Sequence, residues 1–192
     1  MRINKVPLLV IALLAIALVQ PALAQETQKK GAQSQRAVSV SAAVLKQWSE
    51  IGRKLIAMAQ DFPETKYDFK PTPTAGSFAE RLIHAAAANY FFTNIALGQK
   101  APGEEDPPRA QFKNKAAVVA YVRKSFADGT AAIQSRGDNG MVALVADPFT
   151  QGQVRLADLA YSVIEHSGEI YGQLTVYYRV AGLIPPESRP KK

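Results

Sequence analysis

The chain has 192 residues, which is the size of one ordinary domain. Hydrophobic residues make up 47% of it and charged residues 20%, a globular composition that excludes an intrinsically disordered protein. The formal net charge is +7, and the absence of cysteine excludes disulfides, thiolate metal ligands and cysteine nucleophiles. Only two histidines are present, which restricts any chemistry that needs several imidazoles in one site.

Residues 1–24 have the three-part layout of a secretory signal peptide. Arg2 and Lys5 precede an uninterrupted apolar run from Val6 to Val19, and small residues then lead to Ala24. The run is shorter than the roughly 20 residues that a bilayer-spanning helix needs. We therefore predict cleavage between Ala24 and Gln25, a periplasmic or secreted protein, and no stable membrane anchor after cleavage.

The mature chain divides into three parts. Residues 25–38 are polar and lack aromatics, which predicts a disordered leader, and residues 190–192 form a short polar tail. The domain itself is expected over residues 39–189. The remaining positive charge is modest, and part of it lies in the leader and the tail. A nucleic-acid-binding protein concentrates cations on one folded face, so no nucleic-acid partner is expected.

Apolar residues recur with the helical period in four segments, and no alternating run is long enough to predict a strand. The first helix is expected over about 41–61, ending before Pro63. The second is expected over about 78–97, where Ser77 and Glu80 have the spacing of a capping box.

The third helix is expected over about 115–135, with Asn114 as its N-cap and a break at Gly137–Gly140. The fourth is expected over about 151–181, starting from a second capping-box match at Thr150. A Pro- and Gly-rich loop over residues 98–110 is long enough to cross one end of the domain. The pattern predicts an all-α four-helix bundle with a long crossover between helices 2 and 3.

The two histidines occupy apolar helices. His166 falls on the inward-facing positions of the fourth helix, and His84 lies on the second helix, the most apolar in the domain. Both imidazoles are therefore expected inside the bundle, where a polar ring needs a partner. Two hypotheses remain open. Either each ring bonds a carbonyl or hydroxyl, such as that of Ser162, Ser167 or Tyr90, or the two rings face each other and hold a metal ion.

Two segments carry a family resemblance. Residues 80–92 have the sequence ERLIHAAAANYFF, and residues 165–189 have the sequence EHSGEIYGQLTVYYRVAGLIPPESR. Both resemble the DinB-like family of damage-inducible proteins, in which two histidines four positions apart precede a Tyr-Gly-Gln run. Residues 66–71 and 114–126 resemble that family's first connector and third helix. The resemblance spans about 38–189 and implies a four-helix bundle holding a nickel-, zinc- or iron-type ion through three histidines.

The resemblance places the first metal ligand on His84 and the second on His166, but the third position is Ile170. The loss of one ligand from a zinc site lowers its affinity by about two powers of ten. Glu169 could substitute only if its side chain turned inward. The resemblance therefore implies an incomplete site for a divalent transition metal, with no catalytic residue assigned.

Three functional hypotheses follow. The first is an exported DinB-like protein with an incomplete histidine metal site, non-catalytic or weakly active, that binds an unknown small molecule or serves a stress-related role. The second, drawing on thiol-dependent transferases in the family, is a metal-dependent transferase or hydrolase that uses His84 and His166 with Glu169 or water. The third is a structural or partner-binding module, for example a homodimer. An enzyme requires stoichiometric metal, whereas a binding protein requires a pocket between the second and fourth helices.

Overall fold

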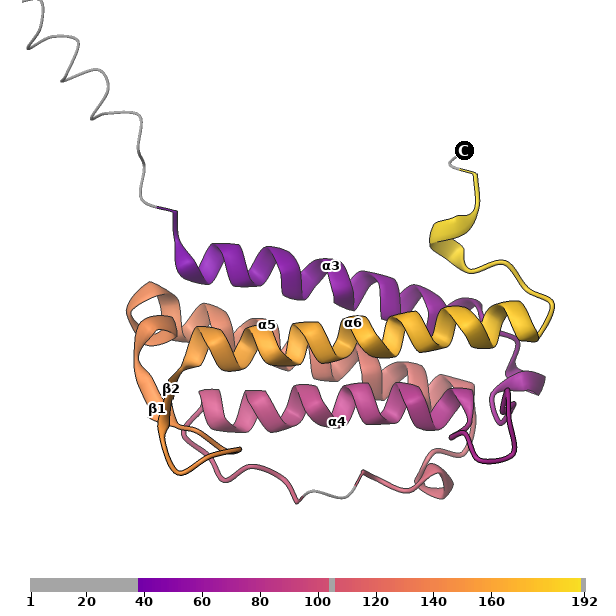
Figure 1. The fold of residues 1–192 in the computed structure, drawn as a ribbon, viewed down its shortest axis with the longest axis horizontal. Coiled ribbons are helices and arrows are strands. Elements are labelled where there is room, and N and C mark those ends of the chain that lie inside the picture. The colour runs from indigo at the N-terminus through magenta and orange to yellow at the C-terminus, as the bar shows by residue number, and fades with distance from the viewer. Residues whose placement is uncertain (1–37, 104–105, 191–192) are drawn as a thin grey trace, which may run out of the picture. The chain divides into compact units, whose positions relative to one another are not determined.

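The computed structural model describes residues 38–103 and 106–190 (Figure 1). Four helices make up the domain: α3 (Val40–Asp61), α4 (Phe78–Ala96), α5 (Lys115–Val142) and α6 (Leu156–Val180). The predicted all-α four-helix bundle is confirmed. The signal peptide, the cleavage position between Ala24 and Gln25, and nearly all of the predicted leader lie outside the described residues.

The helix ends follow the local sequence. Ser77 accepts a hydrogen bond from the Glu80 amide while the Glu80 carboxylate accepts one from the Ser77 amide, so the predicted capping box is confirmed. Asn114 caps α5 through a bond from the amide of Ala117. The helix α3 ends at Asp61, two residues before Pro63, as predicted, because proline disfavours helical backbone in the preceding residue.

The four helices form a ring in which α5 and α6 each pack against both α3 and α4. The α3/α5 and α4/α6 interfaces therefore lie on opposite sides of the bundle. The connection from α4 to α5 runs along the outside of α4, as Figure 1 shows for its described parts. This is the predicted crossover, and it brings Asp106 and the short 3-10 turn Arg109–Gln111 beside the first half of α4.

The region between α5 and α6 corrects the sequence prediction. Two short antiparallel strands, β1 (Leu144–Ala146) and β2 (Gln153–Arg155), pair before α6 begins at Leu156, five residues later than predicted. Thr150 does not cap a helix. Its hydroxyl and the Phe149 amide bond the Asp147 carboxylate instead, which forms the turn between the strands. Strands of three residues are too short to produce a recognisable alternating pattern.

Helix α5 is also longer than predicted. The break predicted at Gly137 is present, since this residue has a φ of 57°, but helical backbone resumes and continues to Val142. Glycine adopts a positive φ at little cost because it lacks a Cβ atom. Within the described parts of the chain, no helix has both the length and the apolar character required to cross a membrane.

Candidate metal centre between α4 and α6

The two histidines face each other across the α4/α6 interface. His84 projects from the first half of α4 and His166 from the middle of α6, and their Nε2 atoms are 3.0 Å apart. The rings are nearly perpendicular, with centroids separated by 4.9 Å. The two imidazoles therefore meet at the α4/α6 interface, and the hypothesis that they hold a metal ion stays a prediction.

Each histidine has a carboxylate on its other ring nitrogen. Asp106 Oδ2 lies 2.8 Å from His84 Nδ1, and Glu169 Oε2 lies 3.4 Å from His166 Nδ1. Asp106 comes from the crossover, whereas Glu169 is three residues after His166 on α6. The hydroxyl and carbonyl partners suggested by the sequence are replaced by two acidic side chains.

The prediction that both imidazoles lie inside the bundle is wrong. The side chain of His84 is 37% exposed and that of His166 is 33% exposed, although their neighbours Ile83 and Ser167 are buried. The helical period places His166 near the inward face, but α4 and α6 leave this edge of their interface open. The pair is therefore accessible from solvent.

The two carboxylates determine which tautomer each histidine adopts and therefore whether its Nε2 atom carries a lone pair. An ionised carboxylate only accepts hydrogen bonds, so the 2.8 Å contact with Asp106 places the proton of a neutral His84 on Nδ1 and leaves a lone pair on Nε2. Glu169 favours the same tautomer in His166, less strongly at 3.4 Å. Two lone pairs 3.0 Å apart repel each other unless a proton or a metal ion lies between them. The donor set therefore fits a divalent transition metal, for which neutral imidazole backed by a carboxylate is a common ligand.

A third protein ligand is lacking among the described residues. No cluster of three or more His, Asp or Glu side chains there could hold a metal ion. Ile170, at the position where the family resemblance places a third histidine, is a buried hydrocarbon. Glu169 is 59% exposed and approaches Nδ1 of His166, on the far side of the ring from Nε2. It is therefore placed to orient His166 and not to replace the missing ligand.

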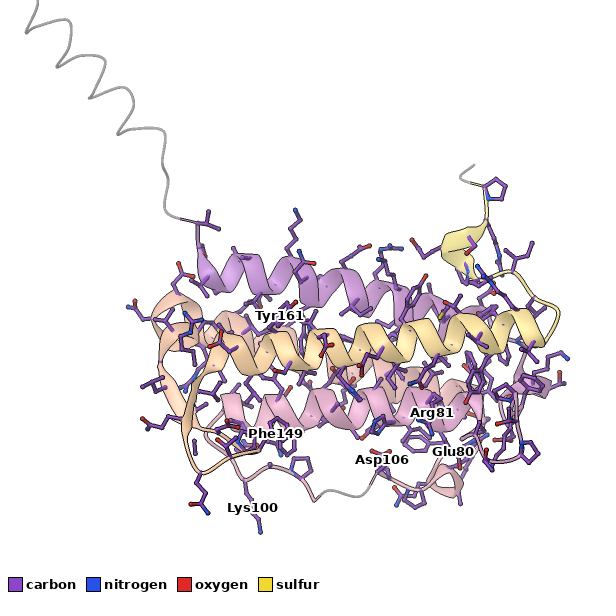
Figure 2. The ribbon with its side chains drawn as sticks, viewed as in Figure 1. Glu80, Arg81, Lys100, Asp106, Phe149 and Tyr161 are labelled. Atoms are coloured by element: carbon purple, nitrogen blue, oxygen red, sulfur yellow. The ribbon has the colours of Figure 1, made fainter. Side chains whose placement is uncertain are left out.

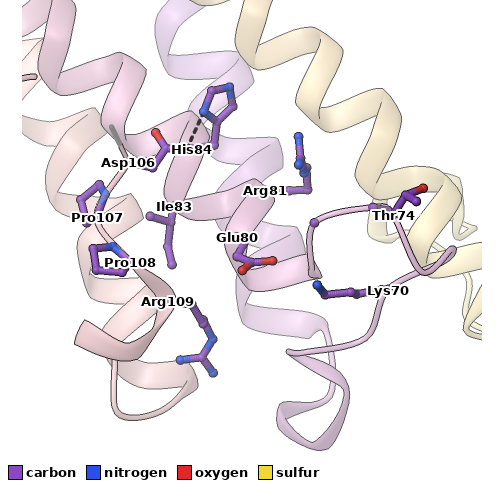
Figure 3. A pocket seen from close by; sticks show the side chains of 12 residues that line it. Lys70, Thr74, Glu80, Arg81, Ile83, His84, Asp106, Pro107, Pro108 and Arg109 are labelled. Carbon is purple, nitrogen blue, oxygen red and sulfur yellow. Dashed lines mark hydrogen bonds and ion pairs between the residues drawn. The ribbon is translucent and has the colours of Figure 1, made fainter. Parts of the chain in front are cut away.

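A pocket of about 520 Å³ lies next to His84 (Figure 3). Its walls are the first half of α4, the connector before α4 and the crossover after it, so it is not enclosed between α4 and α6 as the binding hypothesis requires. Figure 2 shows Glu80, Arg81 and Asp106 together on this side of the molecule. The charged and titratable lining residues are Lys70, Glu80, Arg81, His84, Asp106 and Arg109.

Comparisons with known proteins agree with this description. Residues 47–174 match the family model of the DinB superfamily. A solved DinB-like protein from Bacillus cereus has 20% sequence identity and a TM-score of 0.62 over 74% of this chain and 93% of its own. YfiT from Bacillus subtilis, described as a probable metal-dependent hydrolase with an unusual four-helix bundle topology, has 13% identity and a TM-score of 0.58 over 74% and 88%. No curated protein matches the chain.

The chain belongs to the DinB superfamily, because the family model covers about two thirds of it. The two solved structures show the same fold. The family resemblance seen in the histidine segments is thereby confirmed, whereas the ligand role of His84 and His166 stays a prediction.

Sequence reasoning assigned no functional role to Asp106 or to the pocket cations Lys70, Arg81 and Arg109. Asp106 lies 22 positions after His84 in a Pro-rich loop, and no spacing rule connects the two. Lys70 and Arg81 carry charges typical of any surface. The crossover alone brings Asp106 to the histidine.

Proposed function

We propose that this protein binds a divalent transition metal ion through His84 and His166 and that a small molecule binds beside the ion. The observation that carries the proposal is the approach of the two Nε2 atoms to 3.0 Å, with an acceptor behind each ring. Two neutral imidazoles select ions such as Zn(II) or Cu(II), which bind strongly to nitrogen ligands. With Ile170 in place of a third histidine, the ion is expected to bind weakly and exchange readily.

The test is elemental analysis and calorimetric titration of the protein purified without a chelator or histidine tag. We expect up to one equivalent of Zn(II), Ni(II) or Cu(II) in the wild type and its loss in His84→Ala and His166→Ala. Gln173→Ala, which changes an exposed residue of α6, serves as the control and should bind like the wild type. Equal metal binding by His84→Ala and the wild type would refute the proposal.

A second candidate function is metal-dependent hydrolysis. Two observations favour it: the pair is about one third exposed, which leaves room for water, and YfiT is described as a probable metal-dependent hydrolase. When bound, a divalent transition ion supplies Lewis acidity that activates water near neutral pH. In this hypothesis, His84 and His166 hold the ion, and Asp106 and Glu169 fix the orientation of the two rings.

The two functions are separated by assays on ester, amide and phosphoester substrates with and without added Zn(II). Hydrolysis that depends on both the ion and His84 would establish an enzyme. Stoichiometric metal and ligand binding without turnover would establish a binding protein.

We also propose export to the periplasm or the medium, which residues 1–24 support through their charged start, apolar run and small-residue exit. N-terminal sequencing of protein from the extracytoplasmic fraction should begin at Gln25. Retention of Met1 in the mature protein would contradict this proposal.

A further inference from the structure

The pocket beside His84 is lined by three cationic and two acidic side chains, which differ in whether they already have a partner within the protein. Lys70, Arg81 and Arg109 supply the positive charges, and Glu80 and Asp106 supply the negative ones. Both acids already have partners within the protein. Glu80 accepts a 2.6 Å bond from the Ser77 amide, which holds the pKa of its carboxyl below its usual value, and Asp106 bonds His84.

Of the three cations, only Arg109 has an ion-pair partner among the described residues. Arg109 forms an ion pair with Asp68 and donates to the carbonyl of Phe112, so its guanidinium is occupied. Lys70 and Arg81 form no ion pair with any residue of the described ranges 38–103 and 106–190. Glu80 keeps its negative charge and lies near Lys70 and Arg81, so the three cations and two acids that line the pocket leave a formal excess of one positive charge.

Arg81 is held against the pocket wall by its surroundings. Its Nε atom is buried and finds no acceptor among the described residues. Gly76 lies directly against the guanidinium, because a Cβ atom at this position would be 2.5 Å from Arg81 Nη2. The Gly76 carbonyl in turn accepts a bond from the Tyr177 hydroxyl of α6. The guanidinium thus lies in a defined position against Gly76 and beside the Tyr177 hydroxyl, and its Nε–H has no acceptor among the described residues.

Arg81 also lies next to the histidine pair. It precedes His84 by three residues on α4, and residues three apart lie on the same face of a helix. Figure 3 shows the Arg81 and His84 side chains projecting from adjacent turns at the edge of the pocket. A ligand bound by Arg81 would therefore place its remaining atoms beside His84.

We propose that the pocket binds a small molecule through an anionic oxygen group, a carboxylate or a phosphate, held by Arg81 and Lys70. The planar guanidinium matches the paired oxygens of either group, and charge-assisted hydrogen bonds are stronger than neutral ones. This inference deepens the proposed function, on which it rests, by assigning the chemical class of the ligand. A volume of about 520 Å³ accommodates a ligand of the size of a small metabolite.

The first experiment compares three probes of similar size by calorimetry: phenyl phosphate, benzoate and the neutral benzyl alcohol. We expect at least one of the anions to bind, and benzyl alcohol to bind at least about tenfold more weakly. The two anion arms distinguish a phosphate ligand from a carboxylate ligand. Equal affinity for all three probes, or no binding of either anion, would overturn the inference.

The second experiment uses variants of the full chain. Arg81→Gln should lower anion affinity about tenfold, since one charge-assisted bond is worth about that much, and Lys70→Gln should lower it less. The matched control is Arg179→Gln, which removes an exposed arginine of α6 that does not line the pocket. Equal affinity in Arg81→Gln and Arg179→Gln would overturn the inference.

Gly76→Ala provides a variant that keeps the charge. The added methyl group displaces the flexible guanidinium and not a backbone atom, so we expect weaker anion binding with an unchanged melting temperature. Wild-type anion affinity in Gly76→Ala would show that the position of Arg81 does not matter and would contradict the inference.

Metal titration of the same variants separates the two proposals. Arg81→Gln should retain the metal affinity of the wild type while losing the anion. If the wild type binds no metal but still binds the anion through Arg81, the metal proposal fails and the anion site stands. If metal binds normally and the anion does not, the anion inference alone is refuted.

Discussion

Two opposite interfaces of the bundle are built in contrasting ways. At the α3/α5 interface, Trp48 and Phe126 pack against glycines of the facing helix, and the Trp48 indole donates a 3.0 Å bond to the Phe126 carbonyl. Every one of these side chains is buried. At the α4/α6 interface, His84 and His166 meet with about one third of each side chain exposed. His84 contacts the carboxylate of Asp106 from the crossover, and His166 contacts that of Glu169 on its own helix.

The difference between the two interfaces indicates which one stabilises the fold and which one can bind a ligand. A dry interface filled by aromatic rings stabilises the fold but offers no place for a ligand. A partly open interface loses some apolar contact and keeps polar atoms accessible. The α3/α5 interface therefore contributes chiefly to stability, and the α4/α6 interface holds the candidate site. Three predictions test this division, and a fourth tests an ion pair at the C-terminal end of the domain.

The largest effect is expected from completing the metal site. Ile170→His places a third imidazole one turn after His166 on the same face of α6, and it should raise Zn(II) affinity about 100-fold. Calorimetric titration against the wild type measures the change. Unchanged affinity, in a variant shown to be folded by circular dichroism, would mean that position 170 does not face the ion.

The next effect concerns the closed interface. In Gly129→Ala, the new methyl group would overlap the Trp48 ring, an overpacking cost of about 3 kcal/mol that a gain in helix propensity of about 1 kcal/mol offsets only in part. Gly172→Ala on α6 meets no atom within 4 Å and should instead stabilise the protein by about 1 kcal/mol. Denaturant unfolding of both variants checks the contrast, which would fail if they shifted in the same direction.

A smaller effect separates the two carboxylates. Asp106→Ala removes the 2.8 Å partner of His84 and should weaken metal binding about tenfold, as losses of such supporting groups do. Glu169→Ala removes a more exposed partner at 3.4 Å and should have a lesser effect. A loss of about 100-fold in Glu169→Ala would instead identify Glu169 as the third ligand.

The smallest effect is the acid dependence of stability. Arg189 pairs with Asp61 at the C-terminal end of the domain and holds the pKa of that carboxyl below its ordinary value of 3.8. A lowered pKa in the folded state gives stability that is present above pH 3.8 and is lost as the pH falls through the lowered pKa. The pair is partly exposed, so the loss should be at most about 1 kcal/mol. Arg189→Gln should reduce this loss of stability in unfolding measurements from pH 5 downward. If the variant and the wild type had the same pH profile, the loss would come from other carboxyl groups.

Much of the fold could be predicted because its determinants are local. Ser77, Glu80, Asn114 and Pro63 act on neighbouring backbone groups, and each does so in the structure as expected. The start of α6 could not be predicted, because Asp147 and Thr150 form a turn that depends on the pairing of β1 with β2. A capping-box spacing shows that a side chain could cap a helix, but it does not show whether that side chain forms a different hydrogen bond in the folded protein.

The sequence by itself determined the four helices, the crossover, and the presence of two histidines on apolar helices, since helical period, caps and breakers are short-range properties. It also identified Ile170 as the departure from the family's three-histidine pattern. Only the tertiary structure decided that the imidazoles meet at 3.0 Å, stay partly exposed and are backed by Asp106 and Glu169. Those features depend on how α4, α6 and the crossover pack, and the distance between side chains on different elements is set by that packing and not by their spacing along the chain.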